Sequence, residues 1–406
     1  MIRYLTIPTT TTGNFKMKFN HKFQLSCVAV ACLSTLSPSS VADEARTTSG
    51  DGIELKQGDA IFKITGRILF DYDYFDGVHN NGKSGRGTEL RRGRVHLKGT
   101  FKKWEGKIQV ELNDQTERAQ FKDAYIRYKG WDNVSLTLGK AKEPFSLEVS
   151  ESSKYLATIE RAMASEAFGP SRSYGLGLFA QRGNATFAGG IYAEGQNEED
   201  NQETYAWTGR VTYAPLLTKD AIIHLGLAGS FRDMDGSDYQ IKERAEVHKA
   251  NKIVESGTTV ADNVFLLGLE AAAVFGPFSL RTEYMRADVE AQSESGDKSA
   301  DYDGYYVEAS YFLTGDSRKY KGGRFRKLKP PKANGAWQVL ARFSNLDAHD
   351  NNEGVEADNI TLGINYYASQ NIRISANYLM TDIEGSDVNP NENDGETLSF
   401  RFQYLF

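Results

Sequence analysis

The chain has 406 residues, of which 12% are aromatic and 25% charged, with a formal net charge of -6. An acidic balance argues against nucleic-acid binding. After residue 42, no apolar run reaches the roughly 18–20 residues that a membrane helix needs. Both cysteines, Cys27 and Cys32, precede residue 43, so the remainder offers neither a disulfide nor a thiolate metal site.

The N-terminal residues have the layout of an export signal. Three lysines within 16–22 form a basic start, residues 23–36 are mostly apolar and small, and the triplet Ser-Val-Ala at 40–42 fits a small-x-small cleavage site. We therefore expect residues 1–42 to be a signal peptide and residues 43–60 to be a short periplasmic N-terminal segment. Removing the signal takes away four basic residues and no acidic one, which leaves a net charge of -10.

Two details of this signal leave alternatives open. Met17 is the more natural start, since the residues before it add a threonine-rich lead that a signal does not need. Cys32 hints at a lipoprotein signal, but Ala29 stands where leucine is usual, which disfavours that interpretation.

From residue 61 onward, the chain alternates apolar and polar residues in short runs. Period-two alternation is typical of strands with two different faces, and an even number of strands suits a bacterial outer-membrane barrel. We expect an all-β fold, a transmembrane antiparallel β-barrel of about 16 strands over 61–406. The expected strands are 61–75, 89–101, 104–114, 120–129, 133–145, 173–182, 185–195, 204–216, 221–233, 264–277, 278–290, 303–315, 333–347, 357–369, 371–384 and 395–406.

The expected connections alternate between short and long. Most links after even-numbered strands have one to three residues, such as 102–103 and 183–184, whereas links after odd-numbered strands are longer and polar. Short periplasmic turns and long extracellular loops have this asymmetry.

Two connections, 146–172 and 316–332, depart from this scheme. Residues 146–172 follow the fifth strand, where general porins fold a loop inward, so we expect an in-folded constriction loop with a short helix within 153–168. Residues 316–332 form a nominal periplasmic turn with eight basic residues and one acidic residue. This turn either lines the periplasmic exit or faces anionic lipid or other periplasmic surfaces. Residues 234–263 are expected to form a solvated cap, with a surface for a partner as the alternative.

The final strand ends on alternating apolar residues. One face carries Leu398, Phe400, Phe402, Tyr404 and Phe406. A soluble sheet rarely exposes such an edge, whereas a barrel places one face in lipid and pairs its last strand with its first. A terminal Phe behind alternating aromatics also resembles the signal that the barrel assembly machinery recognises, so we expect Phe406 to serve this role.

Parity along the strands separates a lipid face from a lumen face. The basic residues expected to face the lumen are Lys63, Arg67, Arg92, Arg94, Lys98, Lys107, Arg127, Arg210, Arg281, Arg342, Arg373 and Arg401. The acidic residues are Asp71, Asp73, Glu111, Asp123, Glu270, Glu283 and Glu308. The resulting wall of about +5 favours anion passage, because arginine stays charged and its planar fork matches oxyanions. A weakly selective porin, whose arginines are opposed by acids, remains the alternative.

A series of motifs follows the strands in order. They are I-T-G-R at 64–67, F-D-G at 75–77, L-R-R-G-R at 90–94, F-K-D-A-Y at 121–125, L-G-K at 138–140, S-S-K-Y at 152–155, Y-A-P-L at 213–216, H-L-G-L at 224–227, Y-F-L-T-G-D-S-R-K-Y at 311–320, G-A-W at 335–337, R-F at 342–343 and S-A-N-Y at 375–378. Together, their order and spacing resemble the phosphate-selective porins O and P. The resemblance implies a homotrimer of sixteen-stranded barrels with inward-folded loops, which passes phosphate or other small anions without chemistry.

The resemblance also assigns roles to individual residues. The family's paired constriction arginines fall on Arg91 and Arg92, its constriction aspartate on Asp123, and further pore arginines on Arg210 and Arg232. Parity alone places Arg91 on the lipid side, so either a bulge occurs there or the assignment is wrong.

The family's phosphate site is matched only in part. Val149 stands where phosphate-selective members have a lysine, Arg94 where they have a tyrosine, and Tyr74 where they have an arginine. Lys140 and Lys142 can partly compensate for the missing lysine. We expect the anion-binding and pore-lining residues to be Arg91, Arg92, Arg94, Lys98, Asp123, Arg127, Lys140, Lys142, Arg210, Arg232 and Arg342.

An enzyme is the main rival class, because some outer-membrane barrels are lipases or proteases. Catalysis would need a Ser/His or Asp/His constellation, but His96 and His224 fall at expected lumen positions without a flanking nucleophile motif. No paired-histidine spacing suggests a metal site. We expect no catalytic residue, metal, cofactor or nucleic-acid partner, and we expect contact with outer-membrane lipid.

Overall fold

The computed structural model describes residues 44–48, 52–113, 118–196, 203–326, 328, 334–385, 388 and 393–406. The expected signal peptide, residues 1–42, lies outside the described residues. None of the helices within the described ranges combines the length and the apolar character needed to cross a membrane.

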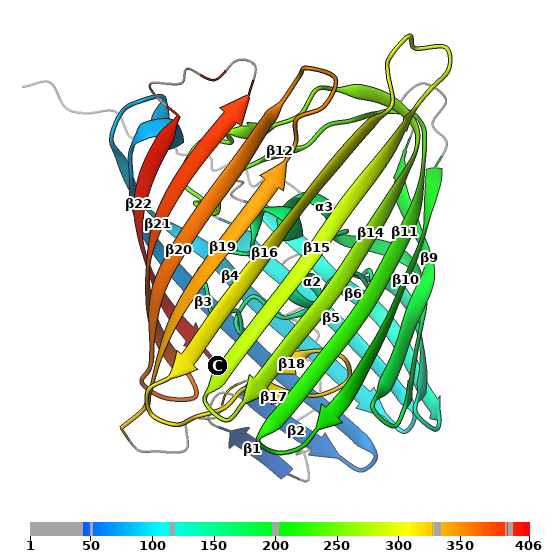
Figure 1. The fold of residues 1–406 in the computed structure, drawn as a ribbon. Coiled ribbons are helices and arrows are strands. Elements are labelled where there is room, and N and C mark those ends of the chain that lie inside the picture. Colours follow the sequence, from blue (N-terminus) through cyan, green and yellow to red (C-terminus); the bar gives the residue numbers. More distant parts are fainter. Residues whose placement is uncertain are drawn as a thin grey trace, which may run out of the picture. The chain divides into compact units, whose positions relative to one another are not determined.

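Sixteen antiparallel strands form a closed barrel, which confirms the predicted fold (Figure 1). The last strand pairs with the first, so that Arg401 lies opposite Asp71. Closure leaves no unpaired backbone edge, which lipid would not tolerate. In chain order the strands are β3 (Ala60–Phe75), β4 (Gly85–Phe101), β5 (Trp104–Asn113), β6 (Arg118–Trp131), β7 (Val134–Lys142), β8 (Arg172–Arg182), β9 (Ala185–Gln196), β10 (Glu203–Leu217), β11 (Ala221–Tyr239), β14 (Thr259–Phe275), β15 (Phe278–Ala291), β16 (Ala300–Phe312), β19 (Ala336–Asp347), β20 (Val355–Tyr367), β21 (Ile372–Gly385) and β22 (Asp394–Leu405).

Two further strands extend the sheet before the barrel begins. β1 (Glu44–Thr48) pairs with β2 (Gly52–Gln57), and β2 pairs with the first residues of β3. β2 and β22 follow one another along the same edge of β3, since the first pairing ends at Ile64 and the second at Arg67. Residues 43–60 therefore contain a hairpin that the alternation did not predict.

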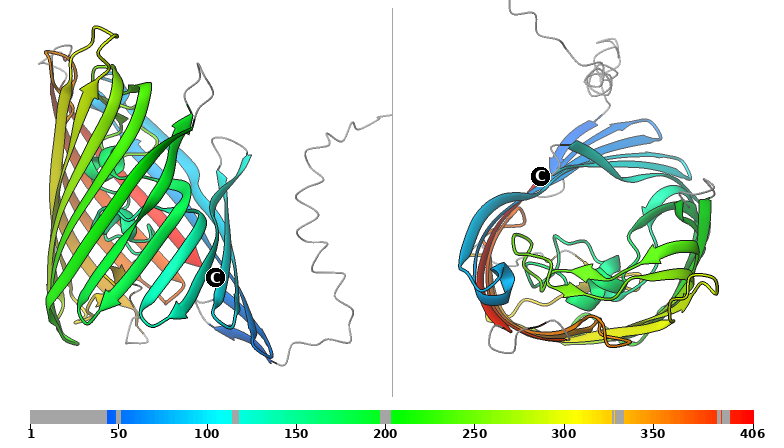
Figure 2. Two further views of the ribbon diagram at one scale, coloured as in Figure 1. Left: turned by 90° about the vertical axis from the view of Figure 1, so that its right-hand side faces the viewer. Right: turned by 90° about the horizontal axis from the view of Figure 1, so that it is seen from above.

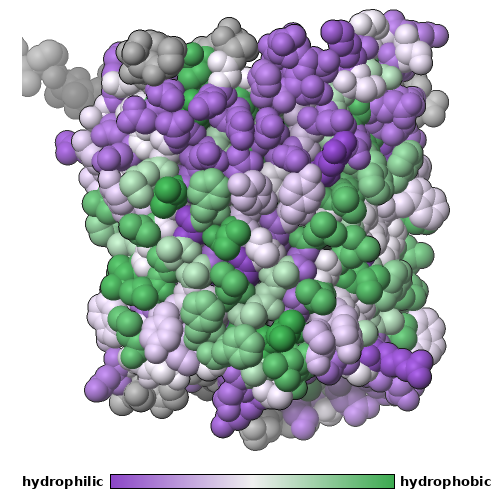
Figure 3. Space-filling model, in the orientation of Figure 1, coloured by the Kyte–Doolittle hydropathy of each residue, from purple (hydrophilic) through white to green (hydrophobic). Residues whose placement is uncertain are grey.

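The outward face of the barrel is apolar and the inward face is polar. On β22, Leu398, Phe400, Phe402 and Tyr404 are 39–42% exposed, whereas Arg401 between them is 2% exposed. On the face shown in Figure 3, apolar residues gather in a band between two hydrophilic ends. The hydrocarbon core of a bilayer would cover this band.

The two ends of the barrel differ in their connections. At one end, two-residue turns join the strands, and Lys102, Gly183 and Gly276 adopt φ values of 52°, 57° and 55°. Tight hairpins require such positive φ angles, which glycine adopts without strain. We call this end the short-turn end; the longer connections begin at the other end, apart from the connection after β16, which begins at the short-turn end.

Three segments fold into the interior of the barrel (Figure 2). The first inner segment is residues 143–171, with α2 (Leu147–Ser150) and α3 (Met163–Phe168); the second is residues 240–258, with β12 (Lys242–Glu243) and β13 (Val254–Glu255); the third is residues 313–326, with β17 (Lys319–Tyr320) and β18 (Phe325–Arg326). The first segment is the predicted in-folded loop.

The second inner segment corrects the expectation of a solvated cap over 234–263. Ile241, Ala245, Val247 and Val254 are at most 3% exposed. These side chains lie inside the barrel because they bury apolar surface there against α3 and the strands. The polar character of the surrounding loop residues concealed this in the sequence.

The third inner segment lies against the inner wall near β10 and β11. Arg210 Nη2 donates to the carbonyl oxygen of Gly323 at 2.9 Å, and Tyr320 Oη hydrogen-bonds His224 Nδ1 at 2.7 Å. The described part of the basic connection 316–332 is therefore inside the barrel, not on an outer surface.

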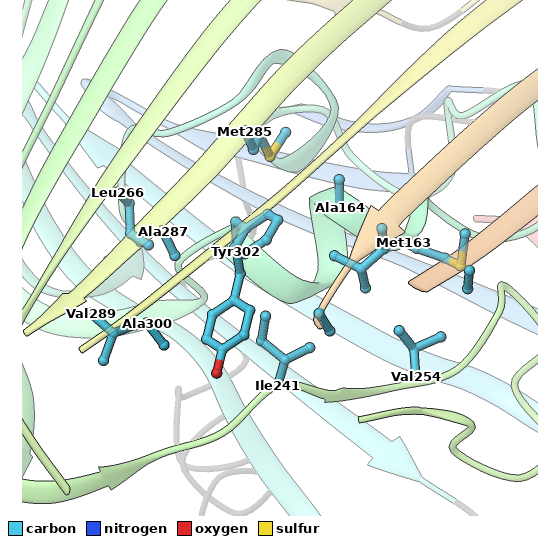
Figure 4. Packing of buried hydrophobic residues seen from close by; sticks show 14 of the residues in the cluster. Met163, Ala164, Ile241, Val254, Leu266, Met285, Ala287, Val289, Ala300 and Tyr302 are labelled. Atoms are coloured by element: carbon cyan, nitrogen blue, oxygen red, sulfur yellow. The ribbon is translucent and has the colours of Figure 1, made fainter. Parts of the chain in front are cut away.

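A hydrophobic core fills part of the interior (Figure 4). Leu266 on β14 and Met285 on β15 point inward and belong to one buried cluster with Met163 of α3 and Ile241 of the second inner segment. Burying such side chains stabilises the packing by about 1.5–3 kcal/mol each. The core closes this part of the lumen to water.

Candidate functional site

A β-bulge turns two consecutive arginines inward. Leu69 pairs with Arg92 and Phe70 with Leu90, so Arg91 has no partner on β3. The extra residue interrupts the alternation, and the Arg91 side chain is only 10% exposed. The bulge therefore resolves the conflict between parity and the family assignment of Arg91.

Arg91 is held by a carboxylate of the first inner segment. Its Nε and Nη2 donate to the two carboxylate oxygens of Glu160, both at 2.9 Å. Arg401 also donates to Glu160, at 2.5 Å, and to Asp71. Burial alone would raise the pKa of Glu160, but Arg91 and Arg401 hold that pKa well below its usual range. The charge of Arg91 is therefore largely offset.

Arg67 and Arg92 have neutral partners instead. Arg67 Nη1 donates to Ser152 Oγ and Arg92 Nη1 to Ser153 Oγ, each at 3.0 Å. Their Nε atoms are buried and unpaired. Within the described ranges, neither guanidinium forms a salt bridge. Two buried positive charges with spare donors are suited to binding an anion.

The predicted constriction aspartate is neutralised by two cations. Lys107 and Arg172 both form salt bridges with Asp123. Arg94 pairs in the same way with Glu111. These acids hold cations in place rather than presenting free negative charge.

These residues surround a central hollow of about 540 Å³. Twelve lysines and arginines line it against four acidic residues. The basic residues are Arg67, Arg91, Arg92, Arg94, Lys107, Lys122, Arg127, Lys142, Arg161, Arg172, Arg324 and Arg326. The acidic residues are Glu111, Asp123, Glu151 and Glu166. Such an excess attracts anions and repels cations.

A second hollow of about 520 Å³ adjoins it toward the short-turn end. The two share Arg127, Lys142, Arg324 and Arg326. Seven lysines and arginines line this turn-side hollow, against Glu143 as the one acidic residue in its lining. The two hollows together form a basic route along β4–β10.

Residues 62–406 match the family of phosphate-selective porins O and P. The chain belongs to this family. Porin O of Pseudomonas aeruginosa is 29% identical over 439 aligned residues, which cover 95% of this chain and 99% of that protein. An uncharacterised protein of Caulobacter vibrioides is 28% identical and matches 82% of this chain and 71% of its own length.

Solved porins have the same fold. An anion-selective porin from Comamonas acidovorans covers 86% of this chain and 100% of its own, with a TM-score of 0.58 and 14% identity. The trimer form of OmpT from Vibrio cholerae covers 86% and 99%, with a TM-score of 0.56 and 11% identity. Family and fold place this porin in the outer membrane of a Gram-negative bacterium, as a channel protein rather than an enzyme.

The predicted site residues divide between the hollows and other places. Arg91, Arg92, Arg94 and Asp123 line the central hollow, Arg127 and Lys142 line both hollows, Arg210 lines the turn-side hollow, and Lys98, Lys140, Arg232 and Arg342 line neither.

Two of these residues are far from their predicted setting. Lys140 lies on the outer face, with its Nζ 5.4 Å from the ring of Tyr174, which is 59% exposed. Strand alternation puts Gly139 and Ala141 inward instead. Arg342 is buried beneath inner segments, where it pairs with Glu246 and, at 3.5 Å, Glu148.

Three further predicted site residues are held by ion pairs: Arg210, Arg232 and Lys98. Arg210 donates through two nitrogens to Glu270, at 2.6 and 2.7 Å, and His224 hydrogen-bonds the same carboxylate at 3.0 Å. Arg232 pairs with Glu143 at 3.0 Å. Lys98 pairs with Glu105 at 2.8 Å.

Several cations of the central hollow were not among the predicted site residues. Arg161 and Arg172 come from the first inner segment and its exit, and Arg324 and Arg326 come from the third. The cluster of basic residues in 316–332 signalled the last two. Nothing local in the sequence signalled Arg161, which donates to the carbonyl oxygen of Glu148 and pairs with Glu166.

Among the described residues, no group of three or more histidine, cysteine, aspartate or glutamate residues could hold a metal ion. His96 lines the central hollow among cations, and His224 is bonded to Glu270 and Tyr320.

Proposed function

We propose that this porin is a passive diffusion channel for small anions, with phosphate or related oxyanions as substrates. The observation that carries this proposal is the pair Arg67 and Arg92, which are buried at the central hollow and have no carboxylate partner among the described residues. The family to which the chain belongs and the anion-selective neighbour from Comamonas acidovorans support it.

The route supplies several moderate sites instead of one tight site. An anion entering the central hollow exchanges water for guanidinium donors of Arg67, Arg92 and Arg94. It then passes to Lys142 and Arg324, which line both hollows. Serial binding of this kind allows an ion both to enter and to leave.

The missing family lysine at position 149 has a substitute in this arrangement. The ammonium of Lys142 donates to the backbone carbonyl oxygens of Val149 and, at 3.2 Å, Glu151. A positive charge therefore stands beside residue 149 despite the valine. This supports retention of oxyanion binding.

The assembly of the porin is part of the proposal. We infer a homotrimer embedded in outer-membrane lipid, with residues 1–42 removed as a signal peptide and residues 43–60 on the periplasmic side. Phe406 would engage the barrel assembly machinery. In the barrel, its backbone N–H and C=O pair with Gly66 at 3.1 and 2.7 Å.

Ion selectivity in a planar bilayer tests the proposed function. We expect the reversal potential across a KCl gradient to report anion preference, and phosphate, pyrophosphate or sulfate to block the chloride current. Arg92→Ala with Arg94→Ala should shift selectivity toward cations. The matched control is Arg286→Ala, whose side chain is 41% exposed on β15 and pairs with Asp288. Cation selectivity of the unaltered porin would refute the proposal.

A further inference from the structure

The two walls of the turn-side hollow differ in chemistry. One wall consists of β7 up to Ala141, β8 and β9. The other consists of β6, β10, the first and third inner segments, and Lys142 at the end of β7, whose ammonium reaches the first inner segment. An inorganic oxyanion uses only the cationic wall, because it has no apolar surface to place on the other.

The strand wall carries no charge over its middle stretch. Alternation turns inward only Ser, Thr, Gly and Ala on β7 over 135–141, and Gly, Phe and Gln on β8 over 175–181. On β9 the inward residues over 186–192 are Thr186, Ala188, Gly190 and Tyr192. Such a wall holds water weakly compared with a charged one.

Tyr192 adds an aromatic ring to this wall. A Cβ on Gly175 would lie 2.6 Å from its Cδ1, and a Cβ on Gly177 would lie 2.8 Å from its hydroxyl oxygen. The ring therefore lies along the glycines of β8, where any larger residue would displace it. These glycines keep the wall thin and the hollow wide.

The opposite wall presents cations whose charge is not consumed. Lys142 donates to carbonyl oxygens, Arg324 Nη1 donates to Ser150 O at 3.5 Å, and Arg326 Nε donates to Lys321 O at 3.3 Å. In the described part of the chain, these three form no salt bridge with a carboxylate.

The acidic residue of the hollow is engaged elsewhere. Glu143 accepts hydrogen bonds from Ser173 at 2.7 Å and Thr208 at 2.6 Å, and it pairs with Arg232 at 3.0 Å. It therefore does not oppose an anion held by the cationic wall.

We propose that the turn-side hollow binds organic phosphomonoesters that carry an aromatic arm. The phosphate group lies on the guanidinium and ammonium donors, and the arm lies on the uncharged wall near Ala188 and Tyr192. The hollow, at about 520 Å³, has the size of a small-molecule pocket. This inference rests on the proposed function, since it needs an anion route, but it names a ligand class that the central hollow does not select.

Phenyl phosphate and methyl phosphate test it, because they share the charged group and differ in the apolar arm. Their affinities are measured as block of single-channel chloride current at a pH where both are dianions. Covering roughly 60 Å² more apolar surface predicts about tenfold tighter block by phenyl phosphate. Ala188→Asn should bring the ratio of the two affinities close to one, since the amide retains water on the wall.

A second variant and a control separate this inference from defects in folding. Ala141→Asn, on β7, which β8 separates from β9, should lower the ratio in the same way. Ala185→Asn makes the same change on the outward face of β9, beside a turn, and should leave the ratio unchanged. Equal affinities in the unaltered porin, or a ratio that persists in both inward variants, would overturn this inference alone. Cation selectivity would instead refute the proposed function and this inference with it.

Discussion

The barrel interior has two halves that follow the same alternation and differ in what their inward residues meet. Along β3–β10, inward arginines border the two hollows, and Arg67 on β3 and Arg92 on β4 donate to serines. Along β11–β21, apolar side chains pack into the hydrophobic core, and Arg281 and Arg342 pair with carboxylates of the inner segments. The partner that an inner segment supplies, a hydroxyl or a carboxylate, therefore decides whether an inward arginine keeps its charge free for an anion.

Arg281 on β15 and Arg342 on β19 illustrate the covered half of the interior, which is the half along β11–β21. Arg281 pairs with Glu148, Glu151 and Glu308 at 2.8–3.1 Å, and its side chain is 2% exposed. These arginines hold the first and second inner segments in place. The parity count treated both arginines as pore charge, so it overstated the number of basic residues that line that side. It also missed the cations that the inner segments themselves contribute.

Breaking an anchor in the covered half has the largest expected effect. Arg342→Met leaves Glu246 buried without its cation, and both side chains are 1% exposed in the native pair. Such a loss costs about 3–5 kcal/mol, so we expect noisier and larger conductance and faster proteolysis of residues 240–258. Adding Glu246→Gln removes the stranded charge and should restore most of the native behaviour. Native conductance in the single variant would contradict the anchoring role.

Changing an arginine in the open half of the interior, where the two hollows lie, should alter anion binding without destabilising the fold. Arg92→Ala removes one charged donor to the anion, worth about 1.5–3 kcal/mol, and should weaken phosphate block about tenfold or more. Arg92→Lys keeps the charge and loses the planar fork, so it should retain anion selectivity while binding phosphate less tightly than the native porin. Titration of the chloride current with phosphate measures the affinity of each variant for phosphate. Identical affinities in the native porin, Arg92→Ala and Arg92→Lys would exclude Arg92 from the anion site.

Glu160 of the first inner segment holds together Arg91 on β4 and Arg401 on β22. Glu160→Gln removes a negative charge beside the central hollow, while Arg401 keeps its pair with Asp71. We expect phosphate to block a few-fold more tightly, by about 1 kcal/mol. Glu255→Gln serves as the control, since Glu255 pairs with Lys242 at a 39% exposed position. Weaker block in Glu160→Gln would argue that the carboxylate positions Arg91 for the anion instead of competing with it.

The smallest expected difference compares two lysines of β7, of which Lys142 borders the hollows and Lys140 lies on the outer face. Lys142→Ala removes a cation from both hollows and should reduce anion selectivity modestly. Lys140→Ala removes a cation from the outer face and should leave the reversal potential unchanged. An equal effect of the two substitutions would mean that distant charge, not contact with the route, sets selectivity.

Most of the barrel could be predicted from the sequence, because each strand records its two environments in its own alternation. The terminal strand from Leu398 to Tyr404 and its closure against the first strand followed from that pattern. The hairpin of β1 and β2 did not, since Glu44–Thr48 lacks an apolar face to alternate with. The bulge at Arg91 was named as one of two options, and only pairing geometry decided between them.

The candidate site could be predicted in part. Inward orientation of Arg92, Arg94 and Arg127 follows from local parity, but the partners of these residues come from elsewhere in the chain. Glu160 lies 69 residues from Arg91, and Glu246 lies 96 residues from Arg342. Alternation carries no information over such separations, so it could not tell an anchoring arginine from one that faces the route.

The sequence by itself determined the closed barrel, its lipid face and the positive character of its lumen. These follow from short-range periodicity, which the pleat of a strand converts directly into two faces. The tertiary structure alone decided where the three inner segments lie, which arginines they neutralise and which remain open to an anion. That outcome depends on contacts between distant residues, where buried charge must find a partner and the cations left without one define the route.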